Sequence, residues 1–145
     1  MANAVFTVWK QLMLGDTAVS GPTLPAPDGS ATITIALIDT ADDTPVPATD
    51  QDLADITGAA IVASGALGSV TVIASGANVT MDAADKTLTA VTGDSAEHMI
   101  IYNNTGTGAT SCLMVHFDTF TSGMPVTPNG GDIVISFHAS GIVQF

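Results

Sequence analysis

Residues 88–137 read LTAVTGDSAEHMIIYNNTGTGATSCLMVHFDTFTSGMPVTPNGGDIVISF, and this stretch decides the fold. It contains three apolar runs of strand length, separated by turns made mostly of Gly, Asn, Thr and Pro. Acidic residues stand at the ends of the runs and form no cluster suited to catalysis. The pattern predicts a stiff sheet with shaped loops.

Similar strand signals, spaced at roughly ten-residue intervals as in a sandwich or barrel, continue outside this stretch. We expect strands at Thr32–Asp39, Ala60–Ala63, Ser69–Ala74, Asn78–Met81, Lys86–Val91, His98–Asn103, Ser111–Asp118, Asp132–His138 and Ile142–Phe145. The predicted fold class is mainly β: an antiparallel β-sandwich, jelly-roll-like. We expect residues 1–145 to form a single domain, with a β core over 32–145.

The first 31 residues are expected to form a short helix and an extended arm. Over Ala2–Leu14 the apolar residues recur at helical spacing and Gly15 would end the helix, although Val, Thr and Phe also suit a strand. This segment packs on its own sheet or docks onto a neighbouring subunit. Residues 16–31 are rich in proline, which favours an extended path. After the Thr32–Asp39 strand we expect a long loop, in which Asp50–Ile56 forms a helical turn capped by Thr49 or Asp50.

Side chains on a strand alternate between two faces. In Ser111–Asp118 one face is plainly core: Leu113, Val115 and Phe117. The opposite face (Cys112, Met114, His116, Asp118) is half apolar, and the corresponding face of Asp132–His138 is equally poor in charge. We infer that this second face is covered, either by residues 16–56 or by another subunit.

Composition excludes several classes of partner. The chain carries 14 acidic residues against Lys10 and Lys86, for a formal net charge of −12. Binding to nucleic acid or to anionic lipid through a basic patch is therefore not expected. No apolar run is long enough for a membrane helix, and the N-terminus does not resemble a secretory signal. Charged residues make up 11% of the chain, against roughly 25% in an average soluble domain, which suits a surface covered by partners.

Candidate reactive groups are few. The aspartates at 39, 42, 43, 50, 52 and 55 could hold Ca²⁺, but their spacing fits solvated loop and cap residues better. His116 and His138 could form a zinc site with Asp118, or serve as neutral interface residues, with a pH response as a minor hypothesis. Cys112 lies inside a predicted strand, and we interpret it as a small apolar core residue. We therefore expect no enzymatic activity, no cofactor and no metal.

Several segments resemble a group of small tailed-bacteriophage virion proteins. The specific matches are TAVTGD (89–94) and MPVTPNGGDI (124–133), with weaker ones at LID (37–39), DQDLADI (50–56), AEHMIIYNNTGT (96–107) and ATS (109–111). The N-terminal VFTVWKQLMLGD and the proline-rich stretch that follows depart from the group's pattern. The resemblance implies a structural protein, associated with decorating or cementing the phage head, and it offers no catalytic residues to carry over.

The leading hypothesis is a capsid decoration or cement protein on the surface of a phage head, made in the host cytoplasm. Its expected partners are the major capsid protein and further copies of itself, as a homodimer or homotrimer. The residues expected at interfaces are Phe6, Trp9, Pro22, Pro25, Pro27, Met114, His116, Pro125, Pro128 and Asn129. For the 125–131 loop, a purely structural turn is equally acceptable. The alternatives are a receptor- or glycan-binding module of a head or tail fibre, and a small β-fold hydrolase.

Overall fold

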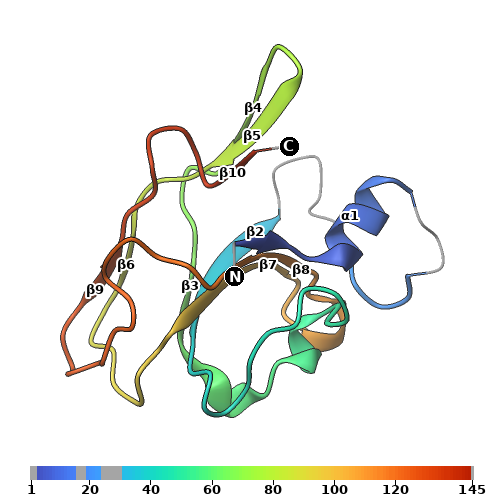
Figure 1. Cartoon of the computed structure of the whole chain (residues 1–145). Coiled ribbons are helices and arrows are strands. Elements are labelled where there is room, and N and C mark those ends of the chain that lie inside the picture. Colours follow the sequence, from blue (N-terminus) through green and yellow to red (C-terminus); the bar gives the residue numbers. More distant parts are fainter. Residues whose placement is uncertain (1–2, 16–18, 24–30, 145) are drawn as a thin grey trace.

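The computed structural model describes residues 3–15, 19–23 and 31–144, and its architecture is mainly β with antiparallel sheets (Figure 1). This confirms the predicted fold class at that level. The largest sheet has five strands in the order β1 (Ala4–Val5), β8 (Leu113–Phe117), β7 (His98–Asn104), β2 (Thr32–Ile38) and β3 (Ile61–Ala66). All four neighbouring pairs in it are antiparallel.

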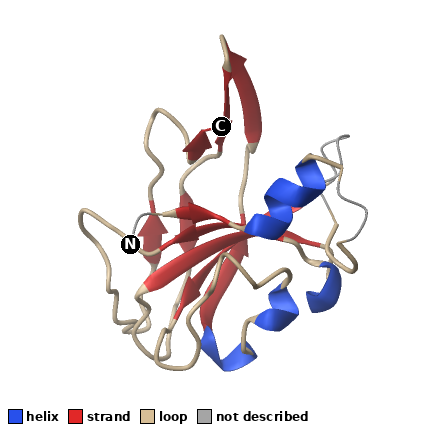
Figure 2. Ribbon diagram, turned by 45° about the vertical axis from the view of Figure 1, so that its right-hand side comes forward, coloured by secondary structure: helices blue, strands red, loops and turns tan. Residues whose placement is uncertain are grey.

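The remaining strands form two smaller sheets. One contains β10 (Val143–Gln144), β5 (Asn78–Asp82) and β4 (Thr71–Ser75), and the other pairs β6 (Lys86–Leu88) with β9 (Ile133–Ile135). β6 contacts β3, so the two-stranded sheet lies against the large sheet, whereas the β4–β5 hairpin projects away from the body (Figures 1 and 2).

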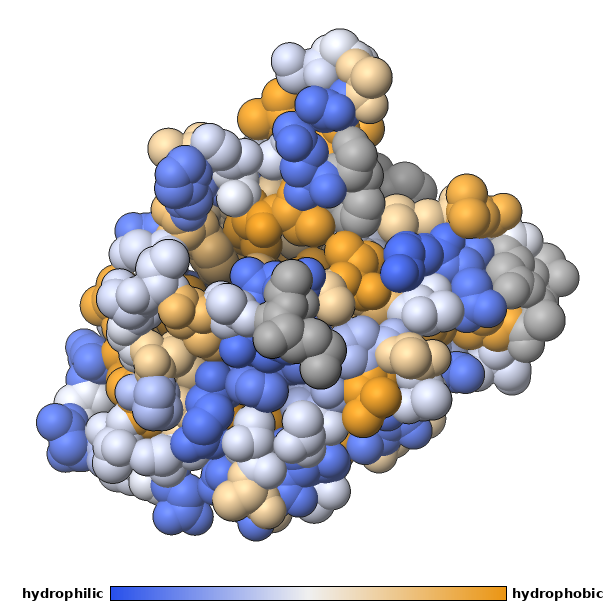
Figure 3. All heavy atoms as spheres, viewed as in Figure 1, coloured by the Kyte–Doolittle hydropathy of each residue, from blue (hydrophilic) through white to orange (hydrophobic). Residues whose placement is uncertain are grey.

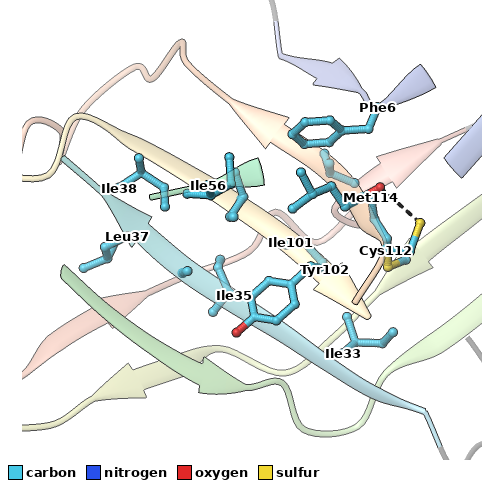
Figure 4. Close-up of a cluster of buried hydrophobic side chains, with 14 of the residues drawn as sticks. Phe6, Ile33, Ile35, Leu37, Ile38, Ile56, Ile101, Tyr102, Cys112 and Met114 are labelled. Atoms are coloured by element: carbon cyan, nitrogen blue, oxygen red, sulfur yellow. Dashed lines mark hydrogen bonds between the residues drawn. The ribbon is translucent and has the colours of Figure 1, made fainter. Parts of the chain in front are cut away.

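The large sheet is buried on both faces at its centre. Ile33, Ile35 and Leu37 of β2 point to one face, while Ala36 and Ile38 point to the other, and all five are buried. Figure 4 shows the four larger of these side chains in one cluster with Phe6 and Ile56, which come from outside the sheet. The alternation expected for a half-exposed strand is therefore absent, because each face has its own cover.

The second face of the Ser111–Asp118 strand is covered, as inferred from sequence, and the cover belongs to the same chain. Residues 40–60 arch beneath the sheet and include two 3₁₀ turns, Leu53–Asp55 and Gly58–Ala60 (Figure 1). A third, Gly108–Thr110, precedes β8. Met114 and His116, which lie on this face, are 1% and 3% exposed within the single chain. The Leu53 N–H donates to the Ser111 carbonyl at 2.9 Å and the Leu113 N–H donates to the Gln51 carbonyl at 3.1 Å, which holds the covering segment on the edge of the strand. No second subunit is needed to bury this face.

The N-terminal helix, α1 (Thr7–Met13), is shorter than the predicted Ala2–Leu14. Ala4 and Val5 form β1 instead and pair with β8, which is the strand alternative that their β-branched and small side chains allowed. The helix then buries Val8 and Trp9 against the chain's own core. Packing on its own sheet is thus the interpretation that the structure favours for this segment.

Several boundaries differ from those predicted. The Lys86–Val91 strand ends at Leu88, ahead of Ala90, whose positive φ of 51° is incompatible with a strand. The Asp132–His138 strand shortens to Ile133–Ile135. The helical turn near residue 50 is capped by Asp52, not by Thr49 or Asp50, because the Asp52 carboxylate accepts the Ala54 N–H at 2.9 Å.

Gly65 of β3 lies where the large sheet packs closely against β6 of the two-stranded sheet. A Cβ at this position would lie 2.4 Å from Lys86 Cε and 2.9 Å from Leu88 Cδ2. We expect Gly65→Ala to reduce the free energy of unfolding by about 1–3 kcal/mol, because the buried Leu88 side chain must shift. Urea denaturation measures this, with Gly58→Ala as the control, since a Cβ at Gly58 meets no atom within 4 Å. Equal stability of the two variants would contradict the close packing of the layers.

Candidate interaction surface

The β4–β5 hairpin has little support from the rest of the described chain. Its two strands pair in regular register from Thr71↔Asp82 to Ser75↔Asn78, joined by the two-residue turn Gly76–Ala77. Gly76 has φ of 61°, a value that two-residue hairpin turns require at this position. The residues from 71 to 79 are all exposed.

Apolar side chains dominate the hairpin in spite of this exposure. Val72 is 69% exposed, Ile73 56% and Val79 39%. The register places Val72 and Val79 on one face and Ile73 on the other, so each face carries an exposed apolar side chain. Figure 3 shows apolar surface on the hairpin and in the angle at its base. Exposed contiguous apolar patches of this kind mark interaction sites.

Apart from Asp82 at its base, the hairpin is also free of charge. Between Asp55 and Asp82 the sequence contains no charged residue, although the whole chain carries a net charge of −12. The acidic surface therefore lies elsewhere, on the body of the molecule. Interface centres are similarly depleted in charge compared with the rest of a protein surface.

The third strand anchors the base of the hairpin. β10 pairs with β5, and the Ile142 N–H donates to the Met81 carbonyl at 2.8 Å. Gly141 has φ of 95°, and a Cβ there would lie 2.2 Å from Thr80 Cγ2. Only glycine permits this approach, which fixes the C-terminal strand beside the hairpin (Figure 1).

Most of the residues expected at interfaces are instead internal. Phe6, Trp9, Met114 and His116 lie in the chain's own core, at 0%, 6%, 1% and 3% exposure, so none of them offers a surface to a partner. Pro22 is also buried. Pro25 and Pro27 lie outside the described residues.

The 125–131 loop keeps an exposed surface. Val126 pairs with Ala96, and Gly130 and Gly131 exchange backbone hydrogen bonds with Val91 at 2.8 and 2.9 Å. Pro125 and Asn129 are exposed, and Pro128 is half-buried. The Asn129 side chain accepts the Gly131 N–H at 3.0 Å, which gives it a structural role in shaping the turn.

His116 has a different partner from the one considered in the sequence. His138 lies beyond β9, which pairs with β6 and not with β8. His116 Nε2 instead lies 3.1 Å from His98 Nδ1 on the neighbouring strand β7. Burial and the nearby His98 lower the pKa of His116 to about 4, and Asp118 acts in the opposite direction. The His116 ring is therefore neutral at pH 7.

The aspartates of the 39–55 region act as loop and cap acceptors. Asp39, Asp43, Asp50 and Asp55 each accept a backbone N–H at 2.6–2.8 Å. Within the described ranges no group of three or more potential metal-ligating side chains is present. These carboxylates thus hold the arch beneath the sheet in shape.

Cys112 is fully buried, and burial followed by the nearby Asp52 charge raises the pKa of its thiol to about 12. A thiol in this state supplies no thiolate nucleophile at neutral pH.

A groove of about 390 Å³ runs beside β3, lined by residues 62–65 and 86–92, and Lys86 is its one charged group. Hydroxyls and a single ammonium supply no general acid–base pair there.

Sequence reasoning assigned the hairpin strands but not their importance. The available signal was the uncharged run across two alternating strands, which leaves apolar residues on both faces of a two-stranded unit.

No helix among the described residues is long and apolar enough to span a membrane. Comparison with known family models and with curated protein sequences gives no match for this chain.

Proposed function

We propose that this chain is a structural protein of a tailed-phage virion, a decoration or cement protein that binds the outside of the head and stabilises junctions between capsid subunits. The proposal extends to a jelly-roll-like sandwich with an extended arm over 16–31, to the major capsid protein and further copies of itself as partners, and to an absence of enzymatic activity. The motifs at 89–94 and 124–133 are the sequence support for it.

The observation that carries the proposal is the exposed part of the β4–β5 hairpin, residues 71–79, which is uncharged and largely apolar on an otherwise acidic molecule. Such a surface suits contacts within an assembly, where apolar area is removed from water. Many copies arrayed on a shell make individually weak contacts effective together, because each bound copy raises the local concentration of the next.

The glycan-binding alternative is not favoured by the aromatic side chains. It predicts aromatic residues exposed on loops, whereas Phe6, Trp9 and Tyr102 are buried and Phe117, Phe120 and Phe137 are half-buried. No specific feature of the described residues supports it over the structural role.

Sedimentation with heads that lack the protein tests the proposal. Wild-type protein is expected to pellet with the heads, and Val72→Asp is expected to bind at least about tenfold more weakly, because it places a charge on the apolar hairpin. Val134→Asp is the matched control, since Val134 is a similarly exposed strand valine (62%) outside the hairpin.

Two results would count against this proposal in different ways. Wild-type protein that stays in the supernatant overturns the cement function. Equal head binding by the two aspartate variants leaves the function standing but removes the hairpin from it.

A further inference from the structure

We propose that β4 is the strand through which two copies of this chain join, pairing edge to edge about a two-fold axis at Ile73. This inference deepens the proposed function and rests on it for the high local concentration of copies on a shell. It names the partner of the apolar hairpin as a second, identical hairpin.

β4 has one free edge. In the sheet order β10–β5–β4 it is the outermost strand, and no described residue pairs with its outer side. A two-residue turn joins a hydrogen-bonded pair, so Ser75, Ile73 and Thr71 exchange hydrogen bonds with β5. Val72 and Ala74 consequently point their N–H and C=O groups outward.

This edge lacks the devices that normally block edge pairing. Native edge strands are guarded by Lys, Pro, bulges or extreme shortness, but residues 71–75 read TVIAS and pair with β5 without a bulge. The edges of the large sheet are better protected. Residues 4–6 and 51–53 bond along β8, and β6 with the 86–92 segment flanks β3.

The strand is complementary to itself. Antiparallel pairing centred on Ile73 sets Ile73 opposite its own copy, Val72 opposite Ala74, and Thr71 opposite Ser75. Val72 and Ala74 then exchange the N–H···O bonds that each edge lacks. Cross-strand pairs of β-branched residues and of hydroxyl residues are stabilising, and no like charges face each other.

Charge favours a second copy over a basic partner. A basic protein surface would be drawn to the acidic body, not to a hairpin whose residues 71–79 carry no charge. Two copies, each with a net charge of −12, repel each other through their bodies. A projecting strand of this length spans roughly 17 Å, which exceeds the Debye length of about 8 Å at physiological ionic strength, so pairing at the hairpins avoids most of the repulsion.

The contact is small. Two paired edges bury much less than the roughly 1,200–2,000 Å² of a stable interface, so dilute protein is expected to be monomeric. Copies held side by side on a shell have a far higher effective concentration, and there the pairing becomes populated.

Disulfide trapping tests this geometry. In Ile73→Cys, the paired residues are a non-hydrogen-bonded pair with Cα atoms about 4.5 Å apart, which suits a disulfide. The native Cys112 is fully buried, so it does not form a disulfide with the introduced cysteine. Copper–phenanthroline with oxygen removes two electrons and two protons from the two thiols. Ser75→Cys is the control, since its copies would lie roughly 13 Å apart in this register.

We expect about tenfold more disulfide-linked dimer from Ile73→Cys than from Ser75→Cys, on heads and in concentrated solution. Adding Val72→Pro should abolish the dimer. The Val72 N–H points away from β5, so proline blocks the edge while the hairpin remains. Circular dichroism and urea unfolding verify that this variant stays folded.

Each outcome decides one of the two proposals. Head binding without selective Ile73→Cys dimers overturns the edge pairing and leaves the cement function intact. Failure to bind heads overturns the cement function, and crosslinking in concentrated solution then decides the pairing alone. Equal crosslinking of the two cysteine variants indicates random collision and overturns the pairing.

Discussion

Replacing Phe6 with alanine is expected to lower the free energy of unfolding by about 3–5 kcal/mol, the range for removing a large buried aromatic side chain. Phe6 is 0% exposed, and its ring lies 6.2 Å from that of His116, centroid to centroid. Its N–H donates to the Met114 carbonyl at 3.0 Å, so the residue also holds the N-terminal segment on the edge of the sheet.

Urea unfolding followed by the fluorescence of Trp9, the single tryptophan, measures this change. Leu14→Ala is the control, because Leu14 is 89% exposed and its truncation should alter stability by less than about 0.5 kcal/mol. A Phe6→Ala protein as stable as wild type but unable to bind heads would restore Phe6 to the interface role that the sequence suggested.

Acid is expected to destabilise the protein specifically through His116. Its pKa falls from 6.5 to about 4 on folding, so between these values the unfolded chain binds more protons than the folded one. Stability is therefore complete above about pH 7 and declines as the pH falls through this window. The full loss is on the order of 3 kcal/mol by the linkage relation, and it levels off below about pH 4.

The pH dependence of urea unfolding, compared with that of His116→Gln, isolates this effect, because the two proteins share every other titratable group. The groups that face His116 are His98, which lowers its pKa further, and Asp118, which opposes the shift. His138→Gln serves as the control, since it is the same substitution at an exposed histidine. Parallel profiles for wild type and His116→Gln would remove His116 as the cause.

The central strands could be predicted well from the sequence. Thr32–Asp39, His98–Asn103 and Ser111–Asp118 match β2, β7 and β8 to within two residues at each end. Their apolar runs are long and bounded by turn residues, so local pattern and tertiary burial agree. The cover over the second face was predictable for the same reason, because a charge-poor face is seldom left in water.

The remaining features depend on contacts that a linear pattern does not encode. β1 exists because β8 presents a free edge to residues 4–5, which otherwise fit a helical stripe. The pairing of His116 with His98 follows from strand order, whereas the sequence offered His138 equally well. The candidate surface was misplaced because Trp9, Phe6 and Met114 are large and apolar, and such residues fit a core as readily as an interface.

The two-residue length of β10 sets a limit on growth. Once two β4 edges have met, the outer margins of the joined sheet are both β10, which offers almost no template for a further strand. Pairing about a two-fold axis therefore ends in a closed unit and cannot extend into a fibre. The free edge of β4 could otherwise promote aggregation into fibres, but in this arrangement it yields only dimers.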